Sequence, residues 1–509
     1  MIGSIDENPR GLIPRLWRGA ASAVLLLAQA AIPGQAQTVP TYHADAARSG
    51  HYTVPGLTWA AAPAMHRDTG FSGTVNGHVY AQPLYWLPSG ARTGQIIVAT
   101  ESNDVYALDA VTGTQIWHRS LGAAVQASAL PCGDIDPSGV TGTPVIDSAS
   151  GTLYLNALVN RANGPRHQIF AISLNDGVIG TGWPLDVGDG IKKLGQSFTP
   201  TIQDQRSALT LVGQELYVTY GGNSRDCDSY HGWVVGLELG APPRLAHAWG
   251  TRALRGGIWA QGGIAYDGGA MFVATGNTSG ATQWGDGEAV VHLGPDLAHS
   301  IATADYFAPA NWKRLDLHDL DLGGTSPLPI DVPTAKGPKL ARVLALGKDG
   351  EAYLLNRADL GGIGGQLAVV KVSSVEIVTA PATFTAGDAV LVAFGGTGTQ
   401  CPRGQSGNLT MLRIVDAKIP IGTAWCESFS GRAAPIVTTS DGAADPIVWI
   451  AGAEGDNRLH GFRGTDGKPL FTGGAAQDGM SNLHHFGTIL AAAGRFYIAS
   501  DGRIYAFAF

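Results

Sequence analysis

Residues 95–122 read QIIVATESNDVYALDAVTGTQIWHRSLG and contain the repeating unit of the chain. One apolar segment ends at a polar turn, a second begins at Val105, and residues 109–113 turn into a third that ends at Trp117. Val, Ile and Tyr favour strands, whereas Asp, Asn and Gly favour the turns between them. The stretch therefore predicts three consecutive short strands that end on an aromatic residue.

The same unit recurs along the chain. Each copy reads strand, Asp or Gly turn, strand and aromatic residue, and further copies lie at residues 167–183, 232–249, 407–425 and 458–471. Eight strands of a fourth type begin at Pro83, Thr143, Ala208, Gly262, Pro327, Ala380, Ala434 and Phe486, at intervals of about 50 to 65 residues. This period indicates an all-β fold, an eight-bladed β-propeller of four-stranded blades, with seven blades as the alternative.

The order of the strands also predicts how the ring closes. The last unit, residues 494–509, lacks an outer strand, and residues 42–61 precede the first complete blade. We therefore expect the N-terminal strand to complete the last blade. Because no linker separates the repeats and a blade has no core of its own, residues 37–509 are predicted to form a single propeller domain.

The composition of the chain excludes several other classes of protein. Glycine accounts for 71 of the 509 residues, only 15% of the residues are charged, and the formal net charge is −8. Helical bundles, coiled coils and long disordered segments are all disfavoured by such a composition. The acidic balance gives no electrostatic reason to bind a phosphate backbone, so we do not expect a nucleic-acid partner.

The N-terminal residues have the features of an export signal. Arg10, Arg15 and Arg18 precede an uncharged run over residues 19–32, and residues 34–36 offer a small-x-small cleavage pattern. We therefore predict a signal peptide over residues 1–36. The apolar run is shorter than the roughly 20 residues that span a bilayer, so no transmembrane anchor is expected after processing. The predicted location is the periplasm or the exterior of the cell.

Four cysteines are compatible with two disulfides in an oxidising compartment. Three pairings are possible by counting alone. Cys401 and Cys426 are the natural local pair, and their pairing leaves Cys132 with Cys227.

Within the repeating unit, VYALDAVTGTQIW at residues 105–117 resembles the tryptophan-docking motif of quinoproteins, the propellers that bind pyrroloquinoline quinone (PQQ). In period and blade number the resemblance extends over nearly all of residues 37–509. Non-enzymatic relatives share this repeat. The resemblance therefore implies the fold more strongly than it implies an activity.

Two segments resemble the cofactor site of quinoprotein alcohol dehydrogenases. Residues 258–278, IWAQGGIAYDGGAMFVATGNT, resemble the stretch in which a tryptophan forms the floor under PQQ and an asparagine ligates calcium. The matching residues are Trp259 and Asn277. Residues 346–357, LGKDGEAYLLNR, resemble the turn that presents a cation to the quinone oxygens, here Lys348. A packed rim tryptophan, an asparagine turn and a solvated hairpin are the structural alternatives.

A third segment, residues 305–328, resembles the loop with the catalytic aspartate in these dehydrogenases and the corresponding segment of polyvinyl-alcohol dehydrogenases. Asp316, Asp319 and Asp321 are candidates for a general base, which must lie close to the alcohol proton. Asp319 and Asp321 are also candidate calcium ligands, and a solvated acidic loop is the alternative.

The chain also departs from the family pattern. Where these dehydrogenases carry two adjacent cysteines, Cys132 stands alone, and where a calcium-ligating glutamate is expected, Asp226 and Asp228 are found. His484 and His485 are predicted to begin the inner strand of the last blade. Because adjacent residues of a strand point to opposite sides, at most one of them would face the central channel, and packing or rim exposure is expected for both.

Three functions fit these observations. The first is an exported PQQ- and Ca²⁺-dependent alcohol or polyol dehydrogenase that passes electrons to a separate cytochrome, since the sequence lacks a haem-attachment motif. The second is a non-catalytic propeller that binds protein or polysaccharide. The third is a glycan lyase or hydrolase that uses the central channel. Convergence of Trp259, Asn277, Lys348 and an aspartate of residues 316–321 would favour the first.

Overall fold

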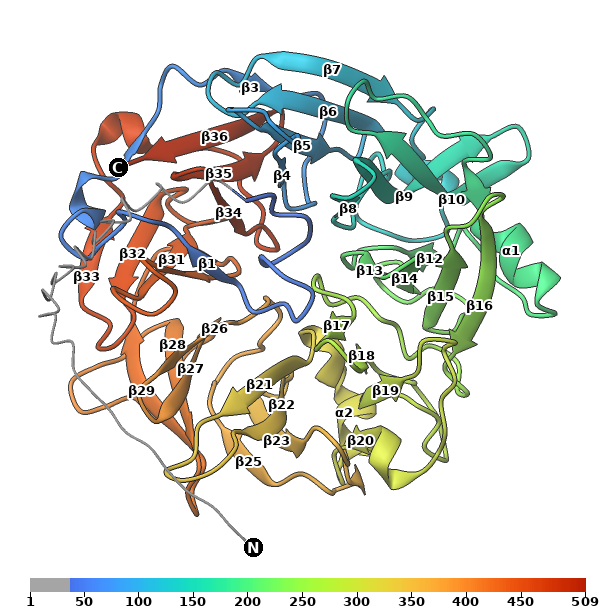
Figure 1. Ribbon diagram of the computed structural model, residues 1–509. Helices are drawn as coiled ribbons and strands as arrows, with labels where there is room; N and C mark the ends of the chain where they lie inside the picture. The colour runs from blue at the N-terminus through green and yellow to red at the C-terminus, as the bar shows by residue number, and fades with distance from the viewer. Residues whose placement is uncertain (1–36) are drawn as a thin grey trace, which may run out of the picture. The chain divides into compact units, whose positions relative to one another are not determined.

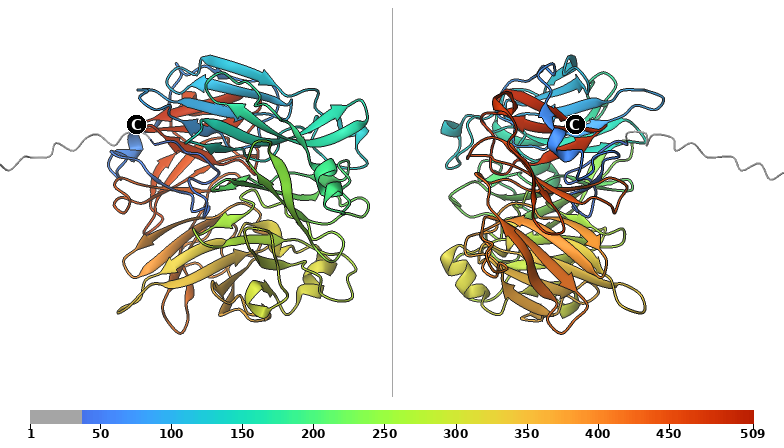
Figure 2. Two further views of the ribbon diagram at one scale, coloured as in Figure 1. Left: turned by 45° about the vertical axis from the view of Figure 1, so that its right-hand side comes forward. Right: turned by 90° about the vertical axis from the view of Figure 1, so that its left-hand side faces the viewer.

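The computed structural model describes residues 37–509, in which eight β-sheets follow one another around a ring (Figure 1). Each sheet is one blade of a β-propeller, so the predicted eight-bladed fold is confirmed. Figure 2 shows the twisted sheets from two further sides. The predicted signal peptide lies outside the described residues. Among residues 37–509, no helix has the length and apolar character needed to cross a bilayer.

Blades one to four hold the first half of the ring. Blade one contains β4 (Leu84–Trp86), β5 (Gln95–Ala99), β6 (Asp104–Asp109) and β7 (Gln115–Ser120). Blade two contains β8 (Val145–Asp147), β9 (Thr152–Arg161), β10 (Gly164–Ser173) and β11 (Leu185–Asp186). Blade three contains β12 (Gln203–Asp204), β13 (Thr210–Val212), β14 (Glu215–Gly222), β15 (Trp233–Glu238) and β16 (Arg244–Gly250). Blade four contains β17 (Ala265–Tyr266), β18 (Met271–Thr275), β19 (Ala289–Leu293), β20 (Tyr306–Ala308) and β24 (Gly362–Ile363).

Blades five to eight complete the ring. Blade five contains β21 (Leu328–Val332), β22 (Leu340–Leu346), β23 (Glu351–Asn356) and β25 (Ala368–Lys371). Blade six contains β26 (Ala382–Ala386), β27 (Ala389–Gly395), β28 (Leu409–Val415) and β29 (Ile421–Glu427). Blade seven contains β30 (Ile436–Thr439), β31 (Ile447–Ala451), β32 (Leu459–Arg463), β33 (Pro469–Thr472) and β1 (His51–Thr53). Blade eight contains β34 (Ile489–Ala492), β35 (Arg495–Ser500), β36 (Arg503–Ala508), β2 (His66–Arg67) and β3 (Gly73–Thr74).

Short helices occur in the loops. The α-helices are α1 (Val187–Lys193) and α2 (Trp312–His318), and single 3-10 turns are η1 (Ala62–Ala64), η2 (Ala127–Ala129), η3 (Thr303–Asp305), η4 (Leu322–Gly324) and η5 (Ala476–Asp478). Of these, α2 and η4 flank residues 319–321, so the acidic loop predicted from the sequence is a partly helical insertion before blade five.

The strand order within the blades defines one functionally important face. From its inner strand each blade proceeds outward through antiparallel neighbours, as β21, β22 and β23 do in blade five. An antiparallel second strand returns the chain to the face from which the inner strand started. The segments before the inner strands and the turns after the second strands therefore share one face of the ring, called the loop face below.

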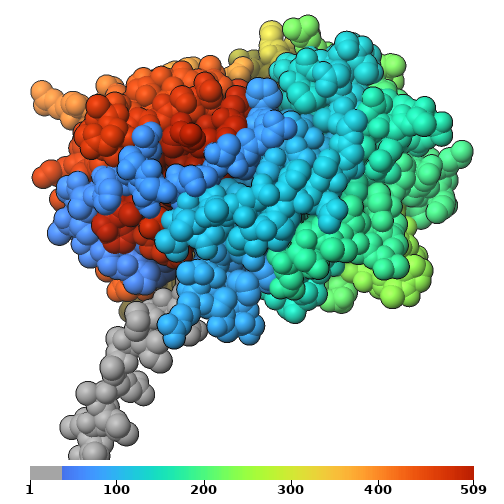
Figure 3. All heavy atoms as spheres, turned by 90° about the horizontal axis from the view of Figure 1, so that it is seen from above, coloured from blue at the N-terminus to red at the C-terminus, as the bar shows by residue number. Residues whose placement is uncertain are grey.

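The ring closes through the N-terminal part of the chain, as predicted. β2 and β3 both pair with β36 and complete blade eight, with His66 opposite Ala508 and Gly73 opposite Ile504. Figure 3 shows N-terminal residues in blue packed against the C-terminal residues in red. The closing strands lie at residues 66–74, downstream of residues 42–61, whose own strand β1 pairs in parallel with β30 of blade seven.

Residues 39–54 run along the inner strands and join them to one another. Their backbone hydrogen bonds reach Tyr85, Ile146, Tyr266, Thr383 and Val437, in blades one, two, four, six and seven. Arg48, only 2% exposed, donates to the carbonyl of Leu209 at 3.1 Å in blade three, and His43 contacts Thr488 beside blade eight at 3.1 Å. The segment before the first blade is therefore a central element of the fold.

The hydrophobic core lies in layers between neighbouring blades, and the aromatic residue of the repeat joins one blade to the next. Trp425 is fully buried, and its Nε1 donates to the carbonyl oxygen of Gly464 in blade seven at 2.9 Å. Gly467, at φ +77°, lies against the indole, where a Cβ would come within 2.8 Å of the ring. Trp117 makes the equivalent bond to Leu174 at 2.8 Å.

Both expected disulfides are formed. Cys401 is bonded to Cys426 across blade six, and Cys132 to Cys227 across a separation of 95 residues. The second disulfide joins the loop before blade two to the turn after β14, and both of these segments lie on the loop face.

Replacing Trp425 by Ala tests the docking of one blade on the next. We expect Trp425→Ala to lower the free energy of unfolding by about 3–5 kcal/mol, because it leaves a buried cavity and an unpaired carbonyl. Urea unfolding followed by intrinsic fluorescence measures the change. Ile419→Ala, at a position 77% exposed, is the matched control and should stay within about 0.5 kcal/mol of the parent protein. Equal unfolding midpoints for the two variants would contradict the interpretation.

Candidate functional site

Five of the residues singled out in the sequence meet on the loop face between blades four and five. Trp259 precedes β17, Asn277 follows β18, Asp319 and Asp321 lie between α2 and β21, and Lys348 is in the turn between β22 and β23. These five residues are called the Trp259 group below. They come from four separate segments that only the closed ring brings together.

Lys348 is at the centre of the Trp259 group. Its Nζ lies 2.6 Å from Oδ2 of Asp321 and 3.4 Å from Oδ2 of Asp319. The same ammonium group is 5.1 Å from the centroid of the Trp259 ring, a distance typical of a cation–π contact. One cation therefore contacts both carboxylates and the indole.

Asn277 connects these carboxylates to blade four. Its backbone N–H donates to Oδ1 of Asp321 at 2.8 Å, and its side-chain Nδ2 donates to Oδ1 of Asp319 at 2.7 Å. At the preceding Gly276, a Cβ would come within 2.9 Å of Asp321 Oδ1 and 3.2 Å of Trp259 Nε1. A glycine is thus required here for the close approach of the indole and the carboxylate.

Burial and charge act against each other in the central ion pair. The side chains of Asp321 and Lys348 are 6% and 13% exposed. Burial raises the pKa of Asp321 above its ordinary value, although Lys348 acts in the opposite direction. Burial alone would lower the pKa of Lys348, but the two carboxylates outweigh it and raise that pKa. Each charge therefore depends on the other.

Asp316 contacts a different part of the site. Its Oδ1 accepts the backbone N–H of Thr278 at 2.7 Å, and its Oδ2 accepts the Thr278 hydroxyl at 3.0 Å. Burial raises the pKa of this carboxyl group. The bonds attach helix α2 to the turn that carries Asn277, which indicates that Asp316 positions the site.

Glu288 is a fourth acidic residue of the site, one that the sequence did not reveal. It is fully buried, and its Oε2 accepts the backbone N–H of Leu322 at 2.7 Å, next to Asp321. Burial, followed by the nearby Asp321 charge, raises its pKa well above the ordinary value. Its Oε1 has no hydrogen-bond partner among residues 37–509. In the sequence, only the Gly-Asp-Gly-Glu turn at residues 285–288 could have drawn attention to Glu288. In the structure Glu288 takes a φ of 50° in this turn.

Asp226 and Asp228 bond to residues outside the Trp259 group. Asp226 accepts a hydrogen bond from the hydroxyl of Tyr230, and Asp228 accepts the N–H of Ser229 at 2.8 Å in an exposed turn. Within the described part of the chain, neither carboxylate forms a hydrogen bond or ion pair with the Trp259 group. Their turn is instead linked to the loop before blade two by the disulfide of Cys227.

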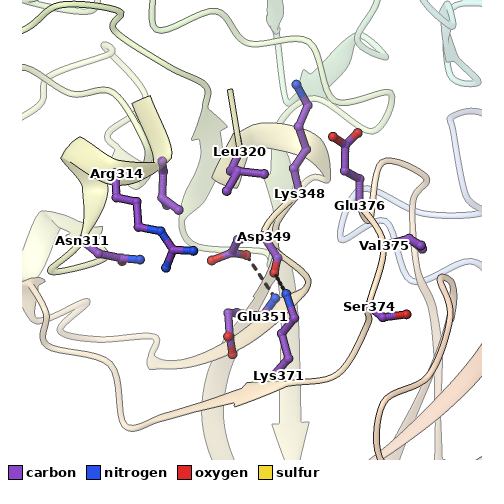
Figure 4. A pocket seen from close by; sticks show the side chains of 11 residues that line it. Asn311, Arg314, Leu320, Lys348, Asp349, Glu351, Lys371, Ser374, Val375 and Glu376 are labelled. Carbon is purple, nitrogen blue, oxygen red and sulfur yellow. Dashed lines mark hydrogen bonds between the residues drawn. The ribbon is translucent and has the colours of Figure 1, made fainter. Parts of the chain in front are cut away.

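A cavity of about 500 Å³ lies beside the Trp259 group (Figure 4). Lys348 borders it together with charged side chains of α2 and blade five, so that a polar ligand would meet charges of both signs. The lining residues are Asn311, Arg314, Leu315, Leu320, Lys348, Asp349, Glu351, Lys371, Ser374, Val375 and Glu376.

A second, small pocket lies at the centre of the loop face and is lined by Tyr80, Arg206, Gln261 and Phe486, among other residues. Gln261, two residues after Trp259, is only 6% exposed, and neither atom of its amide has a partner among residues 37–509. Near this pocket, burial raises the pKa of the Glu101 carboxyl group to about 8.

The prediction that His484 and His485 begin the inner strand of blade eight is wrong. Both lie in the loop before β34 rather than at the start of the strand, so strand alternation does not govern their directions. His484 Nε2 lies 2.6 Å from Oδ1 of Asp501, whereas His485 Nδ1 contacts Glu454. Each ring is thus engaged by a different acidic residue.

Several solved structures have a fold similar to that of this chain. The quinohemoprotein alcohol dehydrogenase ADHIIG from Pseudomonas putida HK5 matches with a TM-score of 0.62 and 13% identity, over 92% of this chain and 79% of that one. The quinohemoprotein alcohol dehydrogenase from Comamonas testosteroni matches with a TM-score of 0.59 and 14% identity, over 92% and 80%. A europium-containing methanol dehydrogenase matches with a TM-score of 0.58 and 14% identity, over 93% and 98%.

The chain shares the fold of these dehydrogenases. Neither a protein-family model nor a curated protein sequence matches it. At 13–14% identity the likeness extends to the propeller and not to the chemistry of its site, because one fold hosts many functions.

Removing Lys348 tests the charge balance of the site. We expect Lys348→Ala to destabilise the protein by about 3–5 kcal/mol near neutral pH, since it leaves Asp321 buried without its cation. The folded-state pKa of Asp321 is already raised, and it will rise further in the variant. A raised carboxyl pKa favours folding at low pH, and this contribution is lost as the pH increases through that pKa. The deficit should therefore be larger at pH 8 than at pH 5.

Urea unfolding of the parent protein and the variant at both pH values measures this effect. The double variant Lys348→Ala with Asp321→Asn is the matched control, because it removes both charges, and it should recover part of the lost stability. A deficit in Lys348→Ala that is independent of pH and unchanged in the double variant would argue against a buried ion pair.

Proposed function

We propose that this chain is an exported quinoprotein-type alcohol or polyol dehydrogenase that binds PQQ and Ca²⁺ at the Trp259 group. The observation that supports it best is the convergence of Trp259, Asn277, Asp319, Asp321 and Lys348 on one site. The resemblance implies a role for each residue, and the five residues come from four segments of the sequence. Because the ring brings such turns to one face in any case, the support lies in the kinds of side chain that meet, namely an indole, a cation, two carboxylates and an amide.

The donor set fits a hard divalent cation. Calcium prefers carboxylate and amide oxygens, and the site offers the carboxylate of Asp321 and the amide oxygen of Asn277, whose Nδ2 donates to Asp319. Asp319, 70% exposed, is assigned to the proton transfer described below. The unpartnered Oε1 of Glu288 is a further oxygen in the same region. Asp226 and Asp228, the other candidate ligands, bond to Tyr230 and Ser229 instead of to the Trp259 group.

The surroundings also fit a planar, anionic quinone. The indole of Trp259 is partly exposed and suits stacking, and Lys348 supplies a cation for quinone oxygens. The amide of Gln261, buried without partners, is a hydrogen-bonding group still to be satisfied in the same loop. When bound, PQQ would supply the acceptor for the hydride of the alcohol.

Of the three candidate bases, Asp319 is the best placed to accept the hydroxyl proton of the substrate. Both oxygens of Asp316 face Thr278, and Asp321 is held by Lys348 and by the N–H of Asn277. Asp319 is exposed, and its contacts with Asn277 and Lys348 orient its carboxylate without covering it. Lys348 and Asp321 would then keep the base and the indole in place.

The electrons would leave to a separate acceptor such as a cytochrome, as the sequence predicts. The two disulfides are consistent with residence in the periplasm or outside the cell, where such bonds persist. The cavity of about 500 Å³ beside Lys348 offers charged and hydroxyl groups to a small alcohol or polyol.

Reconstitution of the purified protein with PQQ and Ca²⁺ tests this proposal. We expect one tightly bound quinone per chain, measured by its absorbance after gel filtration, and reduction of an artificial dye by members of a panel of alcohols and polyols. Trp259→Ala should weaken PQQ binding about 10-fold or more, because stacking on an aromatic ring contributes about 1–3 kcal/mol. Asp319→Asn should retain the quinone but lose about 100-fold or more in kcat.

Asp388→Asn is a matched control for the charge change, because Asp388 is 82% exposed and pairs with Arg413 in blade six. It should bind and turn over like the parent protein. Absence of both bound quinone and activity would reject the dehydrogenase proposal and favour the second function, a non-catalytic propeller that binds protein or polysaccharide. New unsaturated ends on a uronate polysaccharide would instead support the lyase.

A further inference from the structure

A second cluster of ligand-type side chains lies on the loop face, between blades eight and one. His78 precedes β4, His484 precedes β34, and Asp501 is in the turn after β35. In Figure 1 these strands lie across the ring from β17 to β23, which surround the Trp259 group. Three residues far apart in the sequence are thus brought together by the same ring closure that completes blade eight.

The three side chains point at one another. His78 Nδ1 lies 3.0 Å from Oδ2 of Asp501, and His484 Nε2 lies 2.6 Å from its Oδ1. All three ligand atoms fall within 4.8 Å of one another, and the imidazole rings are nearly perpendicular, with centroids 6.1 Å apart. Tetrahedral bonds of about 2.0–2.1 Å to one ion would separate the ligand atoms by about 3.4 Å, so small side-chain rotations suffice.

The environment of His78 Nδ1 is a second observation that points to a shared ion. The atom is inaccessible to solvent, and within the part of the chain that the structure describes it has no hydrogen-bond partner of acceptable geometry, although Asp501 is near. A nitrogen and a carboxylate oxygen that approach without a directed hydrogen bond are arranged as two ligands of a common ion would be.

We propose that His78, His484 and Asp501 form a binding site for a divalent transition-metal ion of the Zn²⁺ type. Two imidazole nitrogens and one carboxylate oxygen suit zinc, whereas calcium prefers oxygen ligands alone. Three protein ligands leave a fourth position for water or a small molecule. The site is therefore distinct in place and chemistry from the oxygen-rich Trp259 group, and it does not depend on the proposed dehydrogenase activity.

A neighbouring aromatic ring helps to hold the cluster in place. Tyr80 stacks on His484 with ring centroids 4.4 Å apart and so restrains the orientation of the imidazole. Tyr80 also lines the small central pocket, so one side chain borders both the cluster and that pocket.

Titration of the chelator-treated full-length protein with Zn²⁺ alone, without PQQ or Ca²⁺, tests the site. We expect one tight site per chain by calorimetry, and with Co²⁺ alone the visible absorption of a four-coordinate ion. Since loss of an outer-shell partner already costs about 10- to 100-fold in metal affinity, His484→Ala should weaken Zn²⁺ binding by more than about 100-fold. Asp501→Asn should act in the same direction.

His485→Ala is the matched control, because the neighbouring imidazole contacts Glu454 instead of this cluster. It should bind Zn²⁺ like the parent protein. Equal affinities of His484→Ala and the parent protein, or loss of binding only in His485→Ala, would overturn the proposal. If a variant does not fold, anomalous scattering at the zinc edge from crystals of the parent protein decides. A peak between the three side chains supports the site, and its absence there rejects it.

Discussion

The inner edges of the blades impose the constraint on which the rest of the molecule depends. Every inner strand presents backbone N–H and C=O groups toward the axis, and buried groups of this kind need partners. Residues 39–54 supply them to most blades and add the buried guanidinium of Arg48, which donates to carbonyls of blades three and four. Residues 66–74 then supply β2 and β3 to blade eight. The N-terminal part of the chain therefore stabilises the ring both along its axis and where the last blade closes it.

The position of both candidate sites follows from this closed ring. Once the inner strands are fixed, the segments before them and the turns after the second strands converge on the loop face. The Asp321 carboxylate illustrates the result, because it accepts the Asn277 N–H of blade four and contacts Lys348 of blade five. Side chains mounted on adjacent rigid blades can hold such contacts more reproducibly than a single mobile loop.

The sequence predicts local and periodic features well and long-range ones poorly. Each of the eight inner strands begins one to three residues after its predicted start, since β-branched runs between turn residues are local signals; β8 begins at Val145, where Thr143 was predicted. The resemblance to quinoproteins also selected residues that do meet at the Trp259 group. Glu288, the pairing of His78 with Asp501 and the path of residues 39–54 were not foreseen, because each depends on segments brought together only by the fold.

The two candidate sites differ in ligand chemistry, and this difference has a consequence for the whole loop face. Asp321 and Asn277 have oxygen atoms to offer an ion, whereas His78 and His484 offer nitrogen. Hard cations such as calcium discriminate against imidazole, and zinc binds it readily. Under the two proposals, one ring would hold two ions of different kinds, and the chemistry of the ligands at each site would select the ion that binds there.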